Sequence, residues 1–322
     1  MRAIQIAQTG GPEVLTLREL PTPTPGAGQA LIEIEACGVN FIDVYVREGR
    51  YPSALPFVPG QEAAGVVVAL GPGVATVKVG DRVAWCHAMG TYAEFAVAPV
   101  SMLIAIPDGV TSRQAAAAML QGMTAHYLSH STYAIQRGDA VLIHAGAGGV
   151  GLLLIQMAKR LGARVLTTVS TEEKAALARE AGADETILYT REDFSAKVGE
   201  LTGGEGVRAV YDSVGKTTFD GSLTCLRRRG VLVLFGGSSG TVPPLDLMRL
   251  STAGSLYVTR PTLKDYSATR EELELRAGDV LRGVVDGSLK LRIEHSYPLG
   301  EAVQAHRDLE ARKTAGKVLL IP

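Results

Sequence analysis

The chain has 322 residues, of which 46% are hydrophobic and 20% charged, with 32 basic side chains against 33 acidic ones. This length predicts about two domains at ~150 residues each, and the composition excludes a mainly disordered chain, which needs low hydrophobicity and high net charge. A nearly neutral chain also lacks the basic excess that binds nucleic-acid phosphates, so we expect no nucleic-acid partner.

Cysteine usage and hydropathy indicate a cytoplasmic protein. Cys37, Cys86 and Cys225 form no CxxC pair, so neither a disulfide framework nor a four-cysteine zinc module is expected. Residues 1–10 lack the apolar core of a secretory signal. Residues 140–158 carry no charge, but four clustered glycines favour a strand, a turn and a helix over a membrane span.

The first third of the chain has the pattern of a β-rich domain, which we place at residues 1–124. Short apolar runs at residues 30–36, 65–70 and 92–97 are separated by segments rich in proline and glycine. This alternation is typical of a small barrel or sandwich.

From about residue 114 the pattern changes to strands that alternate with helices. Helices are expected at residues 150–161, 172–181 and 217–227, and the six candidate strands are residues 140–145, 164–168, 186–189, 209–212, 231–235 and 255–259. This order predicts an α/β fold with a doubly wound parallel sheet, over residues 125–262.

The last segment, residues 263–322, is expected to be helical and to return to the first domain. Thr269 and Glu272 have the spacing of a capping box. The apolar residues that follow recur with a helical period, at Leu273, Ala277, Val280, Leu281 and Val284.

The segment GAGGVG at residues 146–151 matches the GxGxxG pattern directly after an apolar strand and before a helix. Its glycines, Gly146, Gly148, Gly149 and Gly151, would let a pyrophosphate approach the backbone at the positive end of a helix. The context favours a dinucleotide site over a simple packing turn.

The second strand of this unit predicts the choice of cofactor. NAD-binding proteins place an acidic residue at its end for the ribose 2′-OH, but residues 167–171 read TTVST. Lys174 follows one turn later and would attract a 2′-phosphate, so the sequence favours NADPH. Two plainer interpretations remain, in which Ser170 with Glu173 caps a helix and Lys174 is a solvated helix residue.

Several motifs together resemble the zinc-free NADPH:quinone oxidoreductase branch of the medium-chain dehydrogenase/reductase superfamily. They include GGPEVL at 10–15, GVNFID at 38–43, PGQEAAG at 59–65, GDRV at 80–83 and AGAGGVG at 145–151. Later segments continue the similarity over nearly the whole chain, with YDSVG at 211–215, GSLYVTRP at 254–261 and GKVLLIP at 316–322. The resemblance implies a GroES-like catalytic domain joined to a Rossmann domain.

The resemblance also implies that no metal takes part. Zinc alcohol dehydrogenases of the superfamily have a cysteine and a histidine where this chain has Asn40 and Gln61, which are not usual zinc ligands. The four-cysteine lobe is missing too. His126 and His130 have helical spacing, but no third ligand is evident, so packing or surface histidines are favoured.

Without a Lewis acid, reduction of an electron-poor quinone is easier than oxidation of an alcohol. The resemblance implies a quinone held between the two domains and reduced by a hydride or by single electrons. It places four residues in that site: Asn40, Tyr45, Tyr51 and Arg260. Loop packing by the tyrosines and domain anchoring by Arg260 are the alternatives.

The resemblance assigns the cofactor contacts as well. Expected near the nicotinamide half are Phe41, Ile42, Asp43, Thr124 and Tyr127; near the pyrophosphate, Gly149 and Val150; and near the adenosine and 2′-phosphate, Ser170, Lys174 and Tyr189. Strand-end and tail positions complete the set, namely Ser213, Phe235, Gly236, Gly237, Ser238 and Arg312.

Two other functions compete with this one. Related zinc-free reductases use NADPH to reduce the double bond of an alkenal or enone. Others in the group bind AU-rich RNA or serve as lens proteins, although the neutral charge argues against RNA as the main ligand. The family is usually dimeric or tetrameric, so we expect a homodimer or homotetramer. Residues 255–259 are the edge strand that would pair with its copy, and the alternative is that the chain's own tail covers this strand.

Overall fold

The computed structural model describes all 322 residues and divides them into two compact units. Unit 1 joins residues 1–123 to residues 267–322, and unit 2 comprises residues 124–266. Each unit has a hydrophobic core of its own. The unit that contains the glycine-rich turn is therefore inserted into the sequence of the other.

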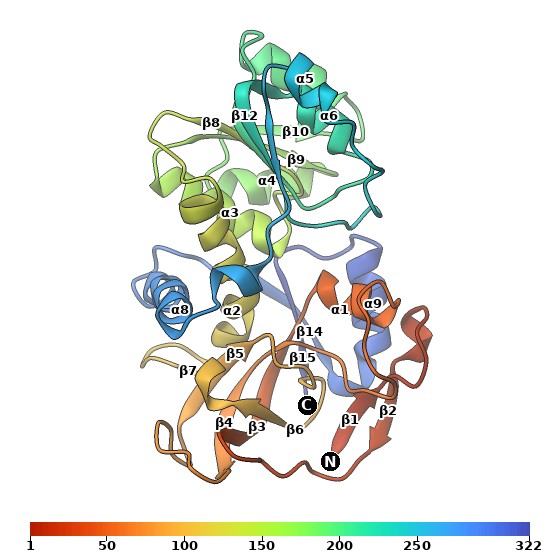
Figure 1. The fold of residues 1–322 in the computed structure, drawn as a ribbon, viewed down its shortest axis with the longest axis vertical. Coiled ribbons are helices and arrows are strands. Elements are labelled where there is room, and N and C mark those ends of the chain that lie inside the picture. The colour runs from red at the N-terminus through yellow and green to blue at the C-terminus, as the bar shows by residue number, and fades with distance from the viewer. The chain divides into compact units, whose positions relative to one another are not determined.

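Unit 2 is built on the parallel six-stranded sheet that the sequence predicts. The strand order is β10-β9-β8-β11-β12-β13, so the direction of the crossovers reverses between β8 and β11 (Figure 1). In sheets of this kind ligands bind outside the carboxyl ends of the strands at that point. The strands are β8 (Ala140–Ile143), β9 (Arg164–Val169), β10 (Glu185–Leu188), β11 (Val207–Asp212), β12 (Leu226–Leu234) and β13 (Tyr257–Thr259).

The helices of unit 2 pack in pairs, because the reversal at β8 sends successive crossovers to opposite faces of the sheet. α3 contacts α4, and α5 contacts α6. The helices are α3 (Gly149–Arg160), α4 (Glu172–Glu180), α5 (Phe194–Leu201), α6 (Phe219–Thr224) and α7 (Met248–Thr252), with a 3-10 turn at Leu263–Tyr266.

One predicted helix was too long. The helix expected at residues 217–227 ends at Thr224, and β12 begins at Leu226 rather than at residue 231. Strand pairing explains the difference, since Val207 of β11 lies opposite Leu226 before the register shifts. The arginine-rich segment that looked like a helix end therefore belongs to a strand.

Unit 1 contains a seven-stranded sheet with the order β14-β15-β3-β4-β5-β7, and β6 also pairs with β3. A separate hairpin joins β1 and β2. The predicted β-rich character is confirmed. The strands are β1 (Arg2–Gln5), β2 (Thr16–Glu19), β3 (Gln29–Val39), β4 (Glu62–Leu70), β5 (Arg82–Cys86), β6 (Phe95–Pro99), β7 (Ile104–Ala105), β14 (Ile293–Pro298) and β15 (Lys317–Ile321).

The C-terminal segment packs into unit 1, but it is not purely helical. β15 pairs antiparallel with β3, with Val318 opposite Val39, and β14 extends the sheet beyond it. The expectation of a helical tail missed both strands, because two short strands carry little periodic signal next to two strong helices. The longer helices of this unit are α1 (Phe41–Arg47), α8 (Arg270–Val285) and α9 (Ala302–Glu310).

The capping box at the start of α8 is confirmed. The backbone N–H of Glu272 donates to Thr269 Oγ1 at 3.2 Å, while the Glu272 carboxylate accepts from the N–H of Thr269 at 3.4 Å. Four of the five periodic apolar residues are buried, and Val284 is half-buried. A Cβ atom at Gly122 of α2 (Ser112–Tyr127) would lie 2.6 Å from Val280 Cγ1, so this glycine lets α2 and α8 approach closely.

The uncharged stretch 140–158 is divided among β8, the glycine-rich turn and most of α3. None of the helices combines the length and the apolar character that a bilayer span requires.

Candidate active site

The turn between β8 and α3 has the geometry of a phosphate-binding loop. A Cβ atom at position 151 would lie 2.3 Å from the carbonyl oxygen of Ala145, and one at position 146 would lie 2.0 Å from Thr167 Oγ1. Both positions therefore require glycine. Ala145 itself has a left-handed backbone, with φ at +54°. The absence of side chains at Gly146 and Gly151 thus lets α3 start close to the ends of β8 and β9.

The same turn leaves backbone donors at the start of α3. Gly148 is the N-cap and has no side chain to accept from the first helical turn. The backbone N–H groups of Gly149, Val150 and Gly151 lie in the first turn of α3, where the helix has no carbonyl four residues earlier to accept from them. Such donors at the positive end of a helix favour a phosphate anion, so the residues of this turn fit the pyrophosphate of a dinucleotide.

The end of β9 carries hydroxyl and ammonium groups. The N-cap of α4 is Thr171, whose Oγ1 accepts from the backbone N–H of Lys174 at 3.3 Å. The capping interpretation of Ser170 is therefore wrong, since the neighbouring threonine has that role. Ser170 is half-buried, and its carbonyl accepts from Thr190 Oγ1 at 3.0 Å.

Lys174 is half-buried in the first turn of α4, and Tyr189 directly follows β10 with 37% of its surface exposed. β9 and β10 are neighbours in the sheet. Residues 168–171 contain no acid that would repel a 2′-phosphate. The arrangement suits the phosphorylated dinucleotide.

The loops after β11 and β12 lie against each other. The N–H of Ser238 donates to the carbonyl of Ser213 at 3.3 Å, and a Cβ atom at Gly236 would lie 2.3 Å from the same oxygen. The N–H of Phe235 donates to the carbonyl of Asp212 at 2.9 Å. These predicted cofactor residues are thus brought together at the carboxyl edge of the sheet, together with Gly237.

A buried polar network beneath this edge was missed by the sequence analysis. His144 Nδ1 lies 2.9 Å from Thr168 Oγ1, and His144 Nε2 lies 3.0 Å from Ser222 Oγ. Ser222 Oγ in turn donates to Asp212 Oδ2 at 2.9 Å. Burial lowers the pKa of His144 below its usual value, and the nearby Asp212 opposes that shift. The lone histidine in the β8 segment was the available signal.

Asp212 anchors the loop that follows β11. Its Oδ1 accepts from the backbone N–H groups of Val214 at 2.8 Å and Gly215 at 2.9 Å. These bonds and the one from Ser222 fix the start of the loop that contains Ser213. Asp212 thereby fixes the backbone around Ser213, a predicted cofactor residue.

Tyr127, Thr124 and Arg260 also belong to unit 2. Tyr127 is 2% exposed, and its ring stacks on Tyr266 with the centroids 4.5 Å apart. Burial raises the pKa of Tyr127, so its hydroxyl stays protonated. Thr124 is 7% exposed, while the exposed Arg260 donates to the carbonyl of Leu234 at 2.9 Å.

In unit 1, the aromatic residues predicted for the site lie in α1 and in the segment directly after it. Phe41 and Tyr45 lie one helical turn apart with ring centroids at 6.3 Å, and Tyr45 contacts Tyr51 edge to face at 6.0 Å. The Arg50 guanidinium lies 5.1 Å from the Tyr45 centroid. Tyr51 is 44% exposed, and Ile42 is half-buried. This cluster offers ring faces to an aromatic ligand.

Asn40 is the N-cap of α1, and its carboxamide lies in a buried polar network. Asn40 Nδ2 donates to Glu62 Oε2 at 2.8 Å, while Asn40 Oδ1 accepts from Lys317 Nζ at 2.9 Å and from Gln121 Nε2 at 3.2 Å. Lys317 also forms an ion pair with Glu62, and both are almost fully buried. The network fixes the Asn40 carboxamide in one orientation.

Asp43 is 1% exposed, in contrast to its half-buried neighbour Ile42. Its Oδ2 accepts from the backbone N–H of Asn40 at 2.9 Å and from the hydroxyl of Tyr92 at 3.0 Å, while Oδ1 has no hydrogen-bond partner. Burial raises the pKa of Asp43 to about 7. The contacts of this carboxyl group are therefore internal to unit 1.

The predicted cofactor residue Arg312 differs from the rest in its surroundings, and the histidine pair with helical spacing forms no metal site. Arg312 is exposed in unit 1, after α9, with a left-handed φ of +58°. The rings of His126 and His130 stack in parallel at 4.3 Å between centroids. Nowhere in the chain do three histidine, cysteine or acidic side chains form a group suited to a metal ion.

Comparison with known proteins agrees with this geometry. Residues 26–108 match the alcohol dehydrogenase GroES-like domain, and residues 149–275 match the zinc-binding dehydrogenase family. The quinone oxidoreductase of Pseudomonas aeruginosa is 46% identical over 323 aligned residues, which cover 100% of this chain and 99% of that protein. The chain belongs to the quinone oxidoreductase family of medium-chain dehydrogenases/reductases.

Solved structures of the family match over the full length. A mycobacterial protein complexed with NADPH superimposes with a TM-score of 0.97 at 53% identity, and covers 100% of both chains. The Escherichia coli quinone oxidoreductase complexed with NADPH gives a TM-score of 0.98 at 44% identity, also over 100% of both chains.

A 2-haloacrylate reductase from Burkholderia is 42% identical, over 99% of this chain and 98% of that protein. The family thus also contains a protein named for another acceptor.

Proposed function

We propose that this protein is an NADPH-dependent quinone oxidoreductase. The observation that carries the proposal is a turn before α3 in which Gly146 and Gly151 have no room for a Cβ atom, in a chain 53% identical to one solved with NADPH. In addition, residues 168–171 at the end of β9 contain no acid, and Lys174 lies in the first turn of α4. When bound, NADPH supplies the reducing equivalents, as a hydride or as single electrons.

The residues of the chain divide this task. The backbone N–H groups of Gly149, Val150 and Gly151 bind the pyrophosphate, while Ser170 and Lys174 bind the 2′-phosphate. Tyr189 lies against the adenosine. The residues toward the nicotinamide half are Phe41, Ile42, Asp43, Thr124 and Tyr127. The loops after β11 and β12 meet the nucleotide through Ser213, Phe235, Gly236, Gly237 and Ser238, and Arg312 lies near the cofactor.

The acceptor quinone lies against the aromatic faces of Tyr45 and Tyr51, where offset stacking favours an electron-poor ring. Arg260 contributes positive potential toward the charge that develops on the quinone oxygens. Asn40 lines the site, in the single orientation that Glu62 and Lys317 impose on its carboxamide.

We further propose that no zinc takes part. Gln61 and Asn40 are poor zinc ligands, and Asn40 already uses its side-chain oxygen to accept from Lys317 and Gln121. Metal analysis of the purified protein together with activity in the presence of a chelator tests this. Stoichiometric zinc that is essential for activity would contradict it.

The function is tested by following NADPH oxidation with 1,2-naphthoquinone, 1,4-benzoquinone and an alkenal. We expect turnover of the quinones. The second candidate is reduction of an activated double bond, which the 2-haloacrylate reductase relative favours. Turnover of the alkenal without turnover of either quinone would establish that candidate instead.

A non-catalytic role in RNA binding has weaker support, since basic and acidic side chains nearly balance. A filter-binding titration at several salt concentrations tests it, and tight binding with a steep salt dependence would favour RNA. A cytoplasmic location stays a prediction.

A homodimer or homotetramer is proposed from the sheet edge. β13 is the last strand of the six-stranded sheet, so one row of its backbone groups has no neighbouring strand. Antiparallel pairing of two copies of β13 would satisfy them. Sedimentation velocity measures the state, and a monomer at micromolar concentration would contradict the proposal.

A further inference from the structure

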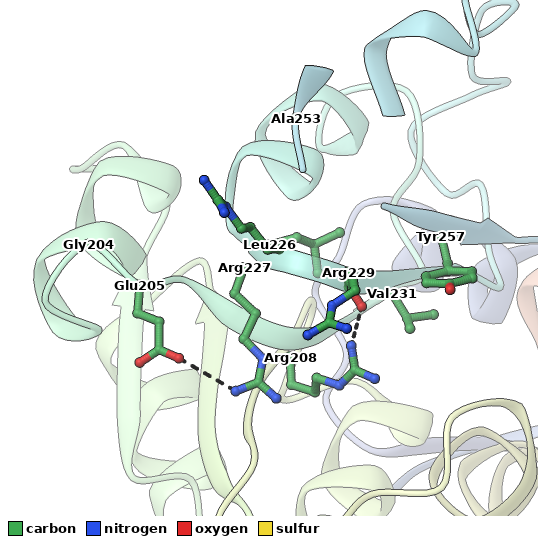
Figure 2. Close-up of a pocket in the computed structure, with 10 residues that line it drawn as sticks. Gly204, Glu205, Arg208, Leu226, Arg227, Arg229, Val231, Ala253 and Tyr257 are labelled. Atoms are coloured by element: carbon green, nitrogen blue, oxygen red, sulfur yellow. Dashed lines mark hydrogen bonds and ion pairs between the residues drawn. The ribbon is translucent and has the colours of Figure 1, made fainter. Parts of the chain in front are cut away.

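Unit 2 contains a second candidate site, an open pocket of 1080 Å³ lined by four arginines (Figure 2). We call it the arginine pocket and define it by Arg208, Arg227, Arg228, Arg229 and Tyr257. Nothing in the proposed reaction uses it.

The arginine pocket lies at the amino ends of the strands, whereas the glycine-rich turn lies at their carboxyl ends. Its residues come from the starts of three parallel strands, with Arg208 in β11, Arg227 to Arg229 in β12 and Tyr257 at the first position of β13. The glycine-rich turn follows the carboxyl end of β8. The pocket is therefore separate from the NADPH site.

The lining has an excess of positive charge. Glu205 is the one acidic residue that lines it, and its carboxylate lies 3.6 Å from Arg227. Arg227 also reaches Asp139 at 3.7 Å. Four guanidinium groups against the carboxylates of Glu205 and Asp139 leave a local charge of about +2, in a chain whose net charge is -1. Such a surface attracts anions.

Arg208 is held without a carboxylate partner. Its Nε donates to the hydroxyl of Tyr133 at 3.0 Å, its guanidinium lies 5.0 Å from the Tyr133 centroid, and it donates to the backbone carbonyl of Arg229. These contacts orient the side chain but leave its charge unbalanced. Figure 2 shows the side chains of Arg208, Arg227 and Arg229 gathered on one side of the strand.

The backbone of β12 is bent so that successive arginines face solvent. Arg229 adopts a left-handed conformation with φ at +57°, which is unfavourable for a residue other than glycine. Its N–H donates to the carbonyl of Gly254 at 2.8 Å, which fixes the bend. Arg228 and Arg229 are both exposed, and neither forms an ion pair. The strained bend thus presents two unneutralised guanidinium groups.

We propose that the arginine pocket binds a nucleoside polyphosphate. Planar guanidinium groups form paired hydrogen bonds with phosphate oxygens, and several of them on one surface suit a chain of phosphates. Tyr257 adds an aromatic ring with 61% of its surface exposed, on which a base can stack. Pairing of β13 with a second copy would use backbone groups of the edge, so it leaves the ring available on the face of the sheet.

Isothermal titration of the full chain, saturated with NADP⁺ so that the glycine-rich turn is occupied, tests the proposal. ATP and inorganic tripolyphosphate are the probes. We expect one additional site for each, with ATP the tighter ligand. Tyr257→Ala should weaken ATP binding to the level of tripolyphosphate and leave tripolyphosphate binding unchanged.

The double variant Arg228→Gln/Arg229→Asn should weaken both probes at least tenfold. Asparagine tolerates the left-handed conformation, so the bend is retained. The charge-matched control is Arg113→Gln/Arg307→Gln, in which two exposed arginines of unit 1 are replaced. A thermal unfolding midpoint equal to that of the control confirms that the double variant is folded.

Three results would overturn the proposal. The first is that neither probe binds, and the second is that the pocket variant and the control variant bind equally. The third is that a single-stranded RNA oligonucleotide binds the pocket while ATP does not, which would assign the arginines to a nucleic-acid backbone. Sedimentation velocity with and without ATP separates ligand binding from a change in association.

Discussion

The ammonium group of Lys317 donates a hydrogen bond to Asn40 Oδ1 at 2.9 Å, although 277 residues separate the two positions in the chain. The same ammonium forms an ion pair with Glu62, whose other oxygen accepts from the backbone N–H of Leu120 at 2.6 Å. One buried charge pair therefore joins β15, β4, α1 and α2. It both stabilises unit 1 and orients a proposed site residue.

Lys317→Met should lower the free energy of unfolding by ~3–5 kcal/mol, because it leaves the carboxylate of Glu62 buried without its counter-charge. Urea denaturation measures the loss. Lys313→Met is the control, since Lys313 is exposed and its ion pair with Asp308 spans 3.6 Å; such a pair contributes ~0–1 kcal/mol. Equal losses in the two variants would show that the Glu62 ion pair does not stabilise the fold.

Gly151→Ala should abolish NADPH binding or weaken it strongly, because the new Cβ atom would meet the carbonyl of Ala145 at 2.3 Å and force the turn open. Fluorescence titration with NADPH measures the affinity. Gly199→Ala is the matched control in α5, where a Cβ atom meets nothing within 4 Å. It should bind NADPH normally and gain ~1 kcal/mol of stability. Normal binding by Gly151→Ala would refute the assignment of the turn.

Lys174→Ala should raise the KM for NADPH about tenfold to a hundredfold, because a hydrogen bond to a charged group contributes ~1.5–3 kcal/mol. The KM for NADH should stay the same, since NADH has no 2′-phosphate. Steady-state kinetics with both cofactors measures the change. A parallel loss with NADH, or equal efficiency of the wild-type protein with the two cofactors, would refute the 2′-phosphate contact.

The pH dependence of stability should reveal the buried pair around Tyr92. Its hydroxyl lies 3.0 Å from Asp43 Oδ2 and 3.1 Å from His306 Nε2. Burial, with a smaller effect of Arg47, lowers the pKa of His306 to about 3, whereas burial raises that of Asp43 to about 7.

Stability from the neutral His306 is present above pH 6.5 and is lost as the pH falls toward 3, because the unfolded chain then binds the extra proton. The contribution of Asp43 has the opposite sign and is lost as the pH rises from about 4 to 7. His306→Gln should therefore destabilise the protein more at pH 7 than at about pH 5. Urea denaturation at both values checks this, with His295→Gln as control. An effect independent of pH would contradict it.

The sequence alone predicted the structure correctly wherever the signal comes from residues close together in the chain. The GxGxxG turn, the capping box at Thr269 and the six strands of unit 2 follow from glycine conformation, hydroxyl capping and short apolar runs, all of which act over a few residues. The absence of an acid from residues 168–171 is also local, and the choice of NADPH follows from it.

Only the tertiary structure brought Lys317, Glu62 and Asn40 together, and only it gathered Arg208 of β11 with Arg227 and Arg229 of β12 in one pocket (Figure 2). Buried charges find partners through the register of β15 on β3, which no short-range pattern encodes. The early start of β12 was decided in the same way, because pairing with β11 outweighs local helix propensity.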